Sequence, residues 1–509
     1  MTARSQGRQW VGLDVGTQGC RAIVVDDSGH VLASARHALS GHRSGAMHEQ
    51  DPMSWIRACT DVLRRVHDDV GPAPVAGLAI CGTSGSFVVC DSAGTPLTPA
   101  VMYDDSRATG RVADNVAQIW SDCADRNGYR IQPTWAVVKL VSMISSDVAL
   151  GRGRLTHVPD FIGWYLAGHR VPSDTSHALK SGYDLVEGCW PKDLFEQAGV
   201  DPGMLPDVVH PGELVGTVTS SAASATGIPA GTPIIAGMTD GCASQIAAGA
   251  VRPGDWNLNL GTTFVLKGVS ENLLRDPDGA VYSHRGFGGW WLPGGASNCG
   301  AGVISSEFGA RPASQWDKTA GGLLPAQAVR YPLPGRGERF PFVRPDAQGF
   351  TMGSPGSEAE SFAAILQGVA YVERLSMSRV AMLGADISGR LSLSGGGARS
   401  ALWNQLIADV LGRPASVARH PDAAFGMAVL AAGSLSSTPQ AADSMIERGE
   451  TIEPDLTRSR QYMDGYLEMV DELQRRDYIS AELADIARGD LPGGRPDRAT
   501  STGRGADFE

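Results

Sequence analysis

The feature that most constrains the fold of this chain is a strand–glycine turn–strand unit that occurs twice. In the first copy an apolar strand runs into the turn Gly16-Thr17-Gln18-Gly19, and a second strand follows at Ala22–Val25. The second copy, W-N-L-N-L-G-T-T-F-V-L-K, occupies residues 256–267. Two strands joined by a short glycine-containing turn form a hairpin. Because the unit recurs, we expect an internal duplication whose two halves face a shared cleft.

The first turn carries groups that suit a nucleotide triphosphate. Asp14 supplies a carboxylate that can hold a hydrated Mg²⁺. Thr17 supplies a hydroxyl, and the flanking glycines leave backbone N–H groups open to an anion. The turn at Gly261-Thr262 would grip the same polyphosphate from the opposite side. For this stretch taken alone, an ordinary hairpin in which the aspartate only forms the turn remains the alternative.

Composition narrows the class of protein. The chain has 509 residues, 42% of them hydrophobic and 19% charged, which is typical of a globular protein with more than one domain. A net charge of −12 argues against a general nucleic-acid binder. No apolar run is long enough for a membrane span, the N-terminus lacks a signal-peptide pattern, and the eight cysteines are scattered without C-x-x-C. We expect a cytoplasmic monomer or homodimer with no membrane or nucleic-acid partner.

A second carboxylate follows the strand P-I-I-A-G-M-T-D-G. The strand ends at Gly237, and Asp240 then begins a helix rich in small residues. A carboxylate at a helix N-terminus is stabilised as an anion by the helix dipole, so Asp240 is suited to accept a proton from a hydroxyl group. A purely structural capping role for this aspartate remains open.

Polar groups that could bind a sugar follow another buried strand, Val75–Cys81. That strand ends in Gly82-Thr83-Ser84-Gly85, at the carboxyl edge where open α/β sheets place their ligands. Farther on, Tyr103 could pack on the carbon face of a sugar and Asp105 could bind its hydroxyls, although a helix-capping role would also explain Asp105. The looser pattern over 115–215 predicts an insertion that shapes a substrate pocket.

A glycine-rich turn suggests a site for adenosine in the second half of the chain. The strand Arg390–Leu393 leads into S-G-G-G-A-R-S-A-L-W, where Gly395-Gly396-Gly397 would permit close approach of a base or ribose. Trp403 would either stack on the purine or face the core. A lone glycine-rich turn is weak evidence for a nucleotide, so both alternatives stay open at this point.

Local signals also mark helices and the end of the chain. Asp51 and the proline after it predict the start of a helix over Met53–Val66. The small-residue segment Ala423–Ala432 predicts a helix that closes the second domain. We further expect one charged, peripheral helix over 458–487 and a disordered Gly/Pro/Arg/Asp-rich tail over 488–509.

Taken in order, the motifs resemble those of the FGGY carbohydrate kinases, which belong to the actin/sugar-kinase/Hsp70-like superfamily. The motifs are D-V-G-T-Q-G, S-G after a strand, Y-D-D-S-R, A-G-M-T-D-G, L-G-T-T and S-G-G-G-A-R-S, and the resemblance covers about residues 8–435. It implies an α/β fold with two ribonuclease-H-like domains flanking a deep cleft. We expect an N-terminal domain at 1–244, a C-terminal domain at 245–440 and a helical extension at 441–509.

The resemblance also implies roles for individual residues. Asp14 would act at the Mg²⁺–phosphate end, Thr17 beside the transferred phosphoryl group, and Asp240 as the general base. The implied sugar-binding residues are Ser84, Gly85, Tyr103, Asp105 and Asp240. The implied ATP-binding residues are Gly16, Thr17, Gln18, Gly19, Arg21, Gly261, Thr262, Gly395, Gly396, Gly397, Ser400 and Trp403.

The sugar itself is indicated by finer motifs. Xylulose kinases of this family usually carry Met-His-Gly where this chain has Ser84-Gly85-Ser86, and glycerol kinases carry Arg-Glu there. The segments H-A-L-K-S-G-Y-D and Y-P-L-P-G-R-G-E-R-F-P resemble the cyanobacterial and plant D-ribulose kinase branch, from which this chain departs at Cys81 and Tyr103. The implied reaction is ATP-dependent phosphorylation of D-ribulose to D-ribulose 5-phosphate. D-xylulose, another ketose or a polyol remains an alternative acceptor, and an ATPase switch that ignores sugars is a competing class.

Overall fold

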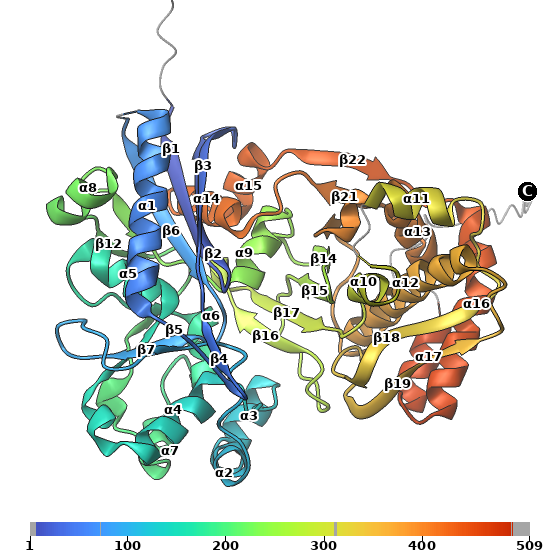
Figure 1. Ribbon diagram of the computed structural model, residues 1–509, viewed down its shortest axis with the longest axis horizontal. Helices are drawn as coiled ribbons and strands as arrows, with labels where there is room; N and C mark the ends of the chain where they lie inside the picture. Colours follow the sequence, from blue (N-terminus) through green and yellow to red (C-terminus); the bar gives the residue numbers. More distant parts are fainter. Residues whose placement is uncertain (1–6, 72, 310–312, 490, 492–509) are drawn as a thin grey trace, which may run out of the picture.

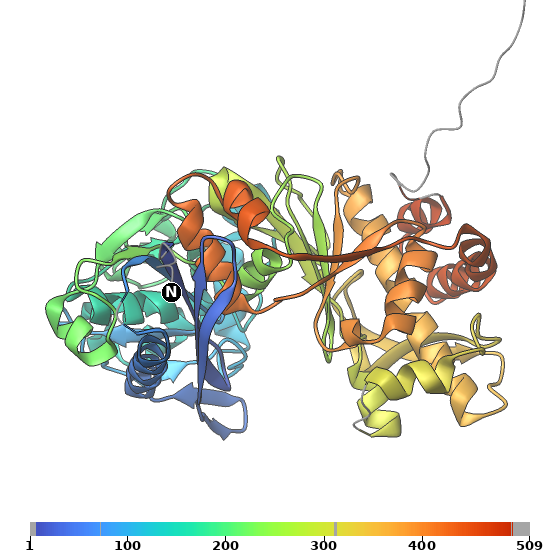
Figure 2. The same ribbon diagram turned by 90° about the horizontal axis from the view of Figure 1, so that it is seen from above.

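The computed structural model describes residues 7–71, 73–309, 313–489 and 491, which form two α/β domains lying side by side (Figures 1 and 2). The first domain is built on a six-stranded sheet in the order β12-β13-β6-β1-β2-β3. Its strands are β1 (Gln9–Val15), β2 (Gly19–Asp26), β3 (Val31–Ala38), β6 (Val75–Gly82), β12 (Leu214–Thr217) and β13 (Pro233–Ile235).

The second domain is built on a seven-stranded sheet in the order β16-β17-β15-β14-β20-β21-β22. Its strands are β14 (Trp256–Leu260), β15 (Phe264–Gly268), β16 (Tyr282–Arg285), β17 (Trp291–Ala296), β20 (Leu391–Ser394), β21 (Ala415–Ala418) and β22 (Arg448–Ile452). In the first sheet β1 pairs antiparallel with β2 and parallel with β6. In the second, β14 pairs antiparallel with β15 and parallel with β20. The two halves therefore share a topology, which confirms the predicted duplication.

Smaller sheets extend both domains. A five-stranded sheet joins β4 (His42–Ser44), β5 (Met47–Gln50), β7 (Phe87–Cys90), β8 (Ala100–Val101) and β9 (Arg154–His157). Two further pairs join β10 (Ser173–Asp174) to β11 (Val208–Val209), and β18 (Val329–Glu338) to β19 (Arg344–Met352). The five-stranded sheet lies in the first domain, together with most of the predicted 115–215 insertion (Figure 1).

Helices cover the sheets. In the N-terminal part they are α1 (Pro52–Val70), α2 (Arg111–Ile119), α3 (Ser121–Asn127), α4 (Ala136–Ser146), α5 (Val158–Ala167), α6 (Thr175–Ala178), α7 (Lys192–Gln197), α8 (Ser220–Thr226) and α9 (Asp240–Ala247). In the C-terminal part they are α10 (Gly302–Phe308), α11 (Ala313–Ala320), α12 (Glu358–Met382), α13 (Ala401–Leu411), α14 (Ala423–Gly433), α15 (Thr438–Met445), α16 (Leu456–Arg475) and α17 (Ala481–Arg488). Single 3₁₀ turns are η1 (Val148–Arg152), η2 (Leu179–Ser181), η3 (Pro202–Met204), η4 (Phe287–Gly289) and η5 (Gly397–Arg399).

Helix α1 forms where its capping residues predict. The Asp51 carboxylate accepts the backbone N–H of Met53 at 3.0 Å, and Pro52 occupies the first helical turn. The helix then buries one apolar face, which includes Trp55 and Leu63, against β2 and β3. A cap at the start and a continuous apolar stripe are local signals, so this element could be predicted without knowledge of the rest of the fold.

The prediction that Ala423–Ala432 closes the second domain is wrong. The helix that forms there, α14, crosses over and packs on β1, β6 and α9 of the first domain (Figure 1). Close packing is possible because two glycines leave room. A Cβ atom at Gly12 of β1 would lie 1.7 Å from the carbonyl oxygen of Ala424, and one at Gly426 would lie 2.0 Å from that of Ala243. The chain then returns to the second sheet at β22.

The C-terminal helical prediction is corrected in part. The expected single helix over 458–487 is two helices, α16 and α17, because Asp477 adopts a left-handed backbone with φ 58°. Ser480 then caps α17 by accepting the N–H of Leu483 at 3.2 Å. Most of the predicted tail 488–509 lies outside the described residues. The proposed domain boundaries at 244 and 440 stay predictions.

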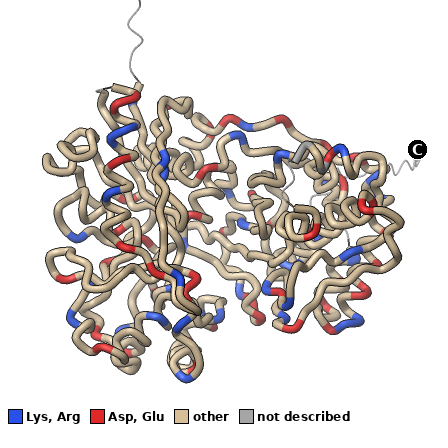
Figure 3. The backbone as a smooth tube through the Cα atoms, in the orientation of Figure 1, with Lys and Arg blue, Asp and Glu red and all other residues tan. Residues whose placement is uncertain are grey.

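Two further global features follow from the described residues. None of the helices in the described ranges has both the length and the apolar character that crossing a membrane requires. Acidic and basic side chains are interspersed over both domains (Figure 3).

Candidate active site

The structure brings Asp14 and Asp240 together at one edge of the first sheet. Asp14 lies near the end of β1, and Asp240 is the first residue of α9, just after a bridge that joins Thr239 to Gly82 at the end of β6. Burial and then the neighbouring Asp240 carboxylate raise the pKa of Asp14 to about 7. The thiol of Cys81 donates to Asp14 Oδ1 at 3.5 Å. Two carboxylates that share one low-dielectric site favour a bound cation or a proton.

Asp240 lies among positively charged groups. Its carboxylate accepts the backbone N–H of Gly241 at 2.7 Å. Burial raises the pKa of Asp240, while that hydrogen bond and the charges of His177, Lys180 and Lys267 oppose the rise. An acceptor hydroxyl placed beside this carboxylate would therefore face a base whose ionised form is supported by three cations.

A buried polar network fixes the turn that carries Asp240. The Ser176 hydroxyl donates to Asp174 at 2.6 Å and accepts the N–H of Thr239 at 2.9 Å. His177 donates through Nδ1 to Asp174 at 2.6 Å and through Nε2 to the carbonyl of Gly82 at 3.3 Å. Although burial lowers the pKa of His177, the Asp174 carboxylate raises it to a net value above the usual range. The network thus favours the protonated form of His177, whose charge acts on Asp240.

The predicted sugar residues Ser84, Gly85 and Tyr103 are held together by a buried lysine. Lys139 donates to the carbonyl of Gly85 at 3.0 Å and to that of Met102 at 2.7 Å. Burial lowers the pKa of Lys139 to about 7. The Tyr103 side chain is 43% exposed, and its phenol is close enough to Asp240 for that carboxylate to raise its pKa, after the larger effect of burial.

The prediction that Asp105 binds sugar hydroxyls is not supported by its surroundings. The residue is completely buried, and both of its carboxylate oxygens are used within the protein. Oδ1 accepts Arg107 Nε at 2.9 Å, and Oδ2 accepts the backbone N–H of His48 at 2.7 Å and Arg107 Nη2 at 2.6 Å. Asp105 therefore holds Arg107 and the backbone of His48 in place, because no oxygen is left exposed to a ligand.

The predicted first phosphate turn, Gly16-Thr17-Gln18-Gly19, is held by one hydrogen bond within its own backbone and by one side chain. Gly16 N–H donates to the carbonyl of Gly19 at 3.0 Å, and Gln50 Nε2 donates to the carbonyl of Thr17 at 2.7 Å. The other end of the Gln50 amide accepts Trp55 Nε1 at 2.7 Å. The side chain of Gln18 is exposed. Sequence reasoning missed Gln50, whose motif H-E-Q-D-P served only to locate the helix start.

Arg21 is placed beside Asp14 but forms an ion pair elsewhere. The two residues lie opposite each other in the register of the β1–β2 hairpin. The guanidinium pairs with Asp422, the residue just before α14. Arg21 thus ties the first phosphate turn to the helix that crosses between domains, and a direct contact with ATP remains a prediction.

The predicted second phosphate turn, Gly261-Thr262, lies next to the glycine-rich turn Gly395-Gly396-Gly397. The carbonyls of Gly261 and Thr262 accept the N–H groups of Ala301 and Gly302, each at 2.9 Å, so the N-terminus of α10 is fixed on this turn. Gly395 has φ +87°, and a Cβ atom there would lie 2.7 Å from the carbonyl oxygen of Leu260. Apart from its chain neighbours, no heavy atom of the described residues lies within 4 Å of a Cβ atom built at Gly396, and Gly397 instead packs on Leu260 and Trp403.

Two of the predicted adenosine residues have structural roles. Trp403 has no exposed surface and lies in the core of the second domain, so of the two alternatives the structure shows the core position. Ser400 is also buried, and its hydroxyl caps α13 by accepting the N–H of Trp403 at 3.0 Å while donating to Asp317. Neither side chain is free to contact a base as predicted.

The residues around the predicted Mg²⁺ position fit a hydrated ion rather than a protein cage. Among the described residues, no group of three or more His, Cys, Asp or Glu side chains is placed to hold a metal ion. Mg²⁺ commonly keeps several waters and binds through one or two carboxylates plus substrate phosphates. Asp14 and Asp240 offer such a pair, and an added cation would offset the burial and the like charge that raise the pKa of Asp14.

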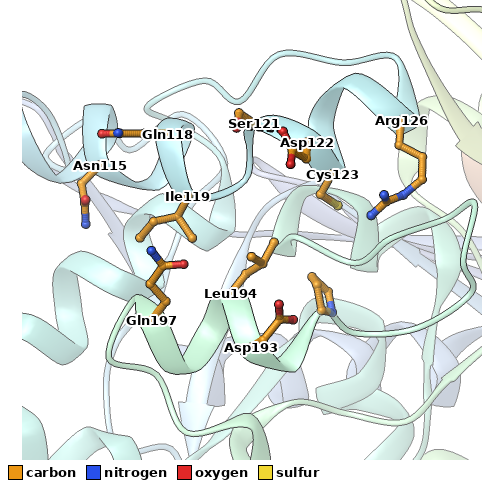
Figure 4. A pocket seen from close by; sticks show the side chains of 11 residues that line it. Asn115, Gln118, Ile119, Ser121, Asp122, Cys123, Arg126, Asp193, Leu194 and Gln197 are labelled. Atoms are coloured by element: carbon orange, nitrogen blue, oxygen red, sulfur yellow. Dashed lines mark hydrogen bonds between the residues drawn. The ribbon is translucent and has the colours of Figure 1, made fainter.

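The surface also has a hollow that is lined by residues other than the candidate site residues. It has a volume of about 590 Å³ and lies between α2, α3 and α7, lined by side chains such as Asn115, Asp122 and Arg126 (Figure 4). None of the predicted catalytic or binding residues lines it.

Comparison with known proteins shows to which family the chain is related. The N-terminal domain model of the FGGY family of carbohydrate kinases matches residues 9–247, and the C-terminal domain model matches residues 256–435. A xylulose kinase from Streptomyces rubiginosus is 30% identical, over 86% of this chain and 90% of that protein. An autoinducer-2 kinase from Escherichia coli is 25% identical, over 89% and 91%. The crystal structure of a xylulose kinase from Rhodospirillum rubrum superposes with a TM-score of 0.82 at 27% identity, covering 92% of this chain and 99% of the other.

Proposed function

Because the chain belongs to the FGGY family of carbohydrate kinases, we propose that it transfers the γ-phosphoryl group of ATP to a hydroxyl of a ketopentose. The observation that carries this proposal is the convergence of Asp14 and Asp240 at the ends of neighbouring sheet elements, with the predicted sugar residues around one and the first phosphate turn beside the other. Phosphoryl transfer to an alcohol uses one carboxylate beside the acceptor hydroxyl, as the base, and another beside the phosphates, where Mg²⁺ binds.

D-xylulose is the first acceptor we propose, and D-ribulose is the second. Several relatives are named xylulose kinases, including the Streptomyces and Rhodospirillum proteins, which favours the acceptor that the sequence motifs left as an alternative. The observation that supports D-ribulose is Ser84-Gly85-Ser86, which stands where xylulose kinases usually carry Met-His-Gly. D-ribulose is therefore no longer the acceptor that we expect first, and the two sugars need to be compared directly as substrates.

In the proposed mechanism Asp240 orients the acceptor hydroxyl and removes its proton as the bond to phosphorus forms. His177, Lys180 and Lys267 favour the ionised carboxylate against the cost of burial. Tyr103 supplies an exposed ring on which the carbon face of the sugar can pack, and Ser84 supplies a hydroxyl. The remaining work is positioning, because phosphoryl transfer has little covalent chemistry for the protein to perform.

The two glycine turns would hold the phosphates, and Asp14 would bind a water-coordinated Mg²⁺ that neutralises phosphate charge. Gly396 offers open space for the ribose or base. Arg21 keeps the first turn attached to α14, so the nucleotide side of the site is coupled to the element that joins the domains.

The proposal is tested by supplying ATP and Mg²⁺ with D-xylulose, D-ribulose, L-ribulose, ribitol or glycerol, and identifying the phosphorylated product. We expect a ketopentose to give the highest kcat/KM. ATP hydrolysis that proceeds equally with and without every sugar would instead indicate the ATPase-switch class.

A further inference from the structure

The chain contains few lysines, and most of them gather at one place. Only five of its 43 Lys and Arg residues are lysines. Three of the five, Lys139, Lys180 and Lys267, surround the Ser84-Gly85 turn and Asp240. An ammonium group is a compact point charge that the planar guanidinium does not replace. In a chain that uses arginine for nearly every cation, three lysines gathered around one turn and one carboxylate indicate a need for the ammonium group itself.

Only two of these three ammonium groups face the region beside Asp240 where we propose that the sugar binds. The third, that of Lys139, donates its hydrogen bonds to the backbone carbonyls of Gly85 and Met102. Lys180, in η2, lies against Gly85, where a Cβ atom would be 3.3 Å from its Cδ. Its Nζ is 5.7 Å from the centre of the Tyr282 ring.

Lys267 approaches from the second domain, at the end of β15. Its Cε would lie 3.1 Å from a Cβ atom built at Gly241, and its Nζ is 3.3 Å from His284 Nδ1 and 3.5 Å from Cys242 Sγ. The turn at Gly261-Thr262 precedes β15, and Lys267 lies about 10 Å farther along the strand than the first residue of β15. Lys267 is therefore on the Asp240 side of the strand rather than at the phosphate turn.

Neither Lys180 nor Lys267 has a carboxylate at ion-pair distance within the described ranges. Both charges act on the same groups. They favour the ionised forms of Asp240 and Tyr282, and after burial they lower the pKa of His284 well below its usual range. Partly buried ammonium groups without a direct carboxylate partner are stabilised by an electron-rich ligand.

We propose that Lys180 and Lys267 bind the carbonyl-type oxygen of the acceptor, either the keto oxygen of a ketose or the carboxylate of a sugar acid, and so discriminate against the corresponding alditol. This inference rests on the proposed function and deepens it. An ammonium group only donates hydrogen bonds, and a carbonyl or carboxylate oxygen only accepts them. The alditol offers a hydroxyl at the same position, which is a weaker partner for two donors that carry charge.

A nearby hydroxyl supports an acceptor in this position. Ser84 Oγ is shielded from solvent and has no hydrogen-bond partner in the part of the chain that the structure describes. It belongs to the turn against which Lys180 packs. A buried hydroxyl without a partner is costly unless a ligand completes it, and a sugar hydroxyl next to the carbonyl would do so.

The test uses Lys180→Met and Lys267→Met in the full-length protein, with Lys192→Met as the matched control because Lys192 is exposed on α7. Lys→Gln variants at both positions repeat the test should a methionine variant fail to fold. Acceptors are D-xylulose, D-ribulose, xylitol, ribitol and D-ribonate. Loss of a charge-assisted hydrogen bond corresponds to a fall of about 10- to 100-fold.

We expect kcat/KM for the better ketose, or for ribonate, to fall by that factor in each site variant. The matching alditol should lose only the activity that depends on the support of Asp240 by the lysine charge, so its kcat/KM should fall by at least about 10-fold less. The KM for ATP should change by less than about 3-fold, and the Lys192→Met protein should behave as wild type. A ketose that falls further than its alditol assigns the keto oxygen as the ligand, and a ribonate that falls further assigns the carboxylate. Equal losses for ketose and alditol, or a raised KM for ATP, would overturn the inference, because the lysines would then act only on Asp240 or on the phosphoryl group.

Calorimetric binding of each acceptor without ATP separates this inference from the proposed function. If wild type phosphorylates no sugar, the proposed function fails, while lysine-dependent binding of a ketose or of ribonate would still support the inference. Binding that is equally tight in wild type and both lysine variants contradicts the inference even where phosphorylation occurs, and so does a wild type that binds none of the acceptors.

Discussion

At the scale of single residues, the site depends on charged groups held away from water by specific partners. Lys139 is the plainest case, since its ammonium group is buried and donates hydrogen bonds to two backbone carbonyls. Its pKa of about 7 lies far below the value of 10.5 expected in the unfolded chain. Between these two values the unfolded chain binds more protons than the folded protein, so this residue makes stability rise with pH in that window.

We therefore predict that the stability difference between wild type and Lys139→Met depends on pH. Below about pH 7 wild type bears the full cost of burying the charge, and above that pH the cost disappears progressively. The free energy of unfolding of wild type minus that of the variant should increase from pH 7 to pH 9.5, as measured by urea denaturation. A difference that is constant over this range would mean that Lys139 keeps an ordinary pKa.

A second prediction concerns Gln50, whose amide links Thr17 to Trp55. Gln50→Leu removes the hydrogen bond that fixes the first phosphate turn, so the KM for ATP should rise by about 3- to 10-fold while sugar binding changes little. Initial-rate kinetics with ATP as the varied substrate measure this effect. Gln197→Leu, at an exposed position of α7, is the control. Equal effects on the KM for ATP and for sugar would show a general loss of structure instead.

At the scale of elements, α14 decides how the two domains are joined. Its small residues let it approach both β1 and α9, the elements that carry Asp14 and Asp240. Gly426→Ala would place a Cβ atom 2.0 Å from the Ala243 carbonyl oxygen, so the α14–α9 contact must open.

We expect Gly426→Ala to destabilise the protein by about 1–3 kcal/mol or more and to lower kcat, because α9 moves with Asp240. Urea denaturation and steady-state kinetics check the two effects. Gly396→Ala is the matched control for stability, since nothing lies within 4 Å of the added methyl group. Equal stability of the two variants would argue against close packing at Gly426.

The elements also show what the sequence alone could predict. The two hairpins and the start of α1 follow from local strand, turn and capping signals, and these predictions agree with the structure within a few residues. The crossing of α14 to the first domain could not be predicted, since small residues suit close packing against either domain. For the same reason the periodicity around Trp403 did not distinguish a core residue from a stacking one. Lys180 and Lys267 are isolated lysines without a local motif, and only the fold brings them together.

At the scale of the whole molecule, two domains of related topology contribute separate parts of the proposed site. The first provides both carboxylates and the proposed sugar turn, and the second provides Lys267, the proposed second phosphate turn and the glycine-rich turn. The Arg21–Asp422 pair joins the first phosphate turn to the connection between the domains. A reaction divided between domains in this way requires their approach when substrates bind, which also excludes water from the phosphoryl group.

We predict that hydrolysis of ATP without sugar is at least about 100-fold slower than phosphorylation of the preferred ketopentose, because water does not drive the approach of the domains. Release of ADP with and without sugar gives both rates. Comparable rates would show that the site is complete without an acceptor.

The central claim is that Asp240 is the base that activates the acceptor, and Asp240→Asn tests it most directly. The variant should bind the ketopentose within about 3-fold of wild type by calorimetry, while kcat falls by about 10²–10⁴-fold. Asp193→Asn, at an exposed position of α7, should leave both values unchanged. An Asp240→Asn protein that retains the wild-type kcat would contradict the assignment of Asp240 as the base.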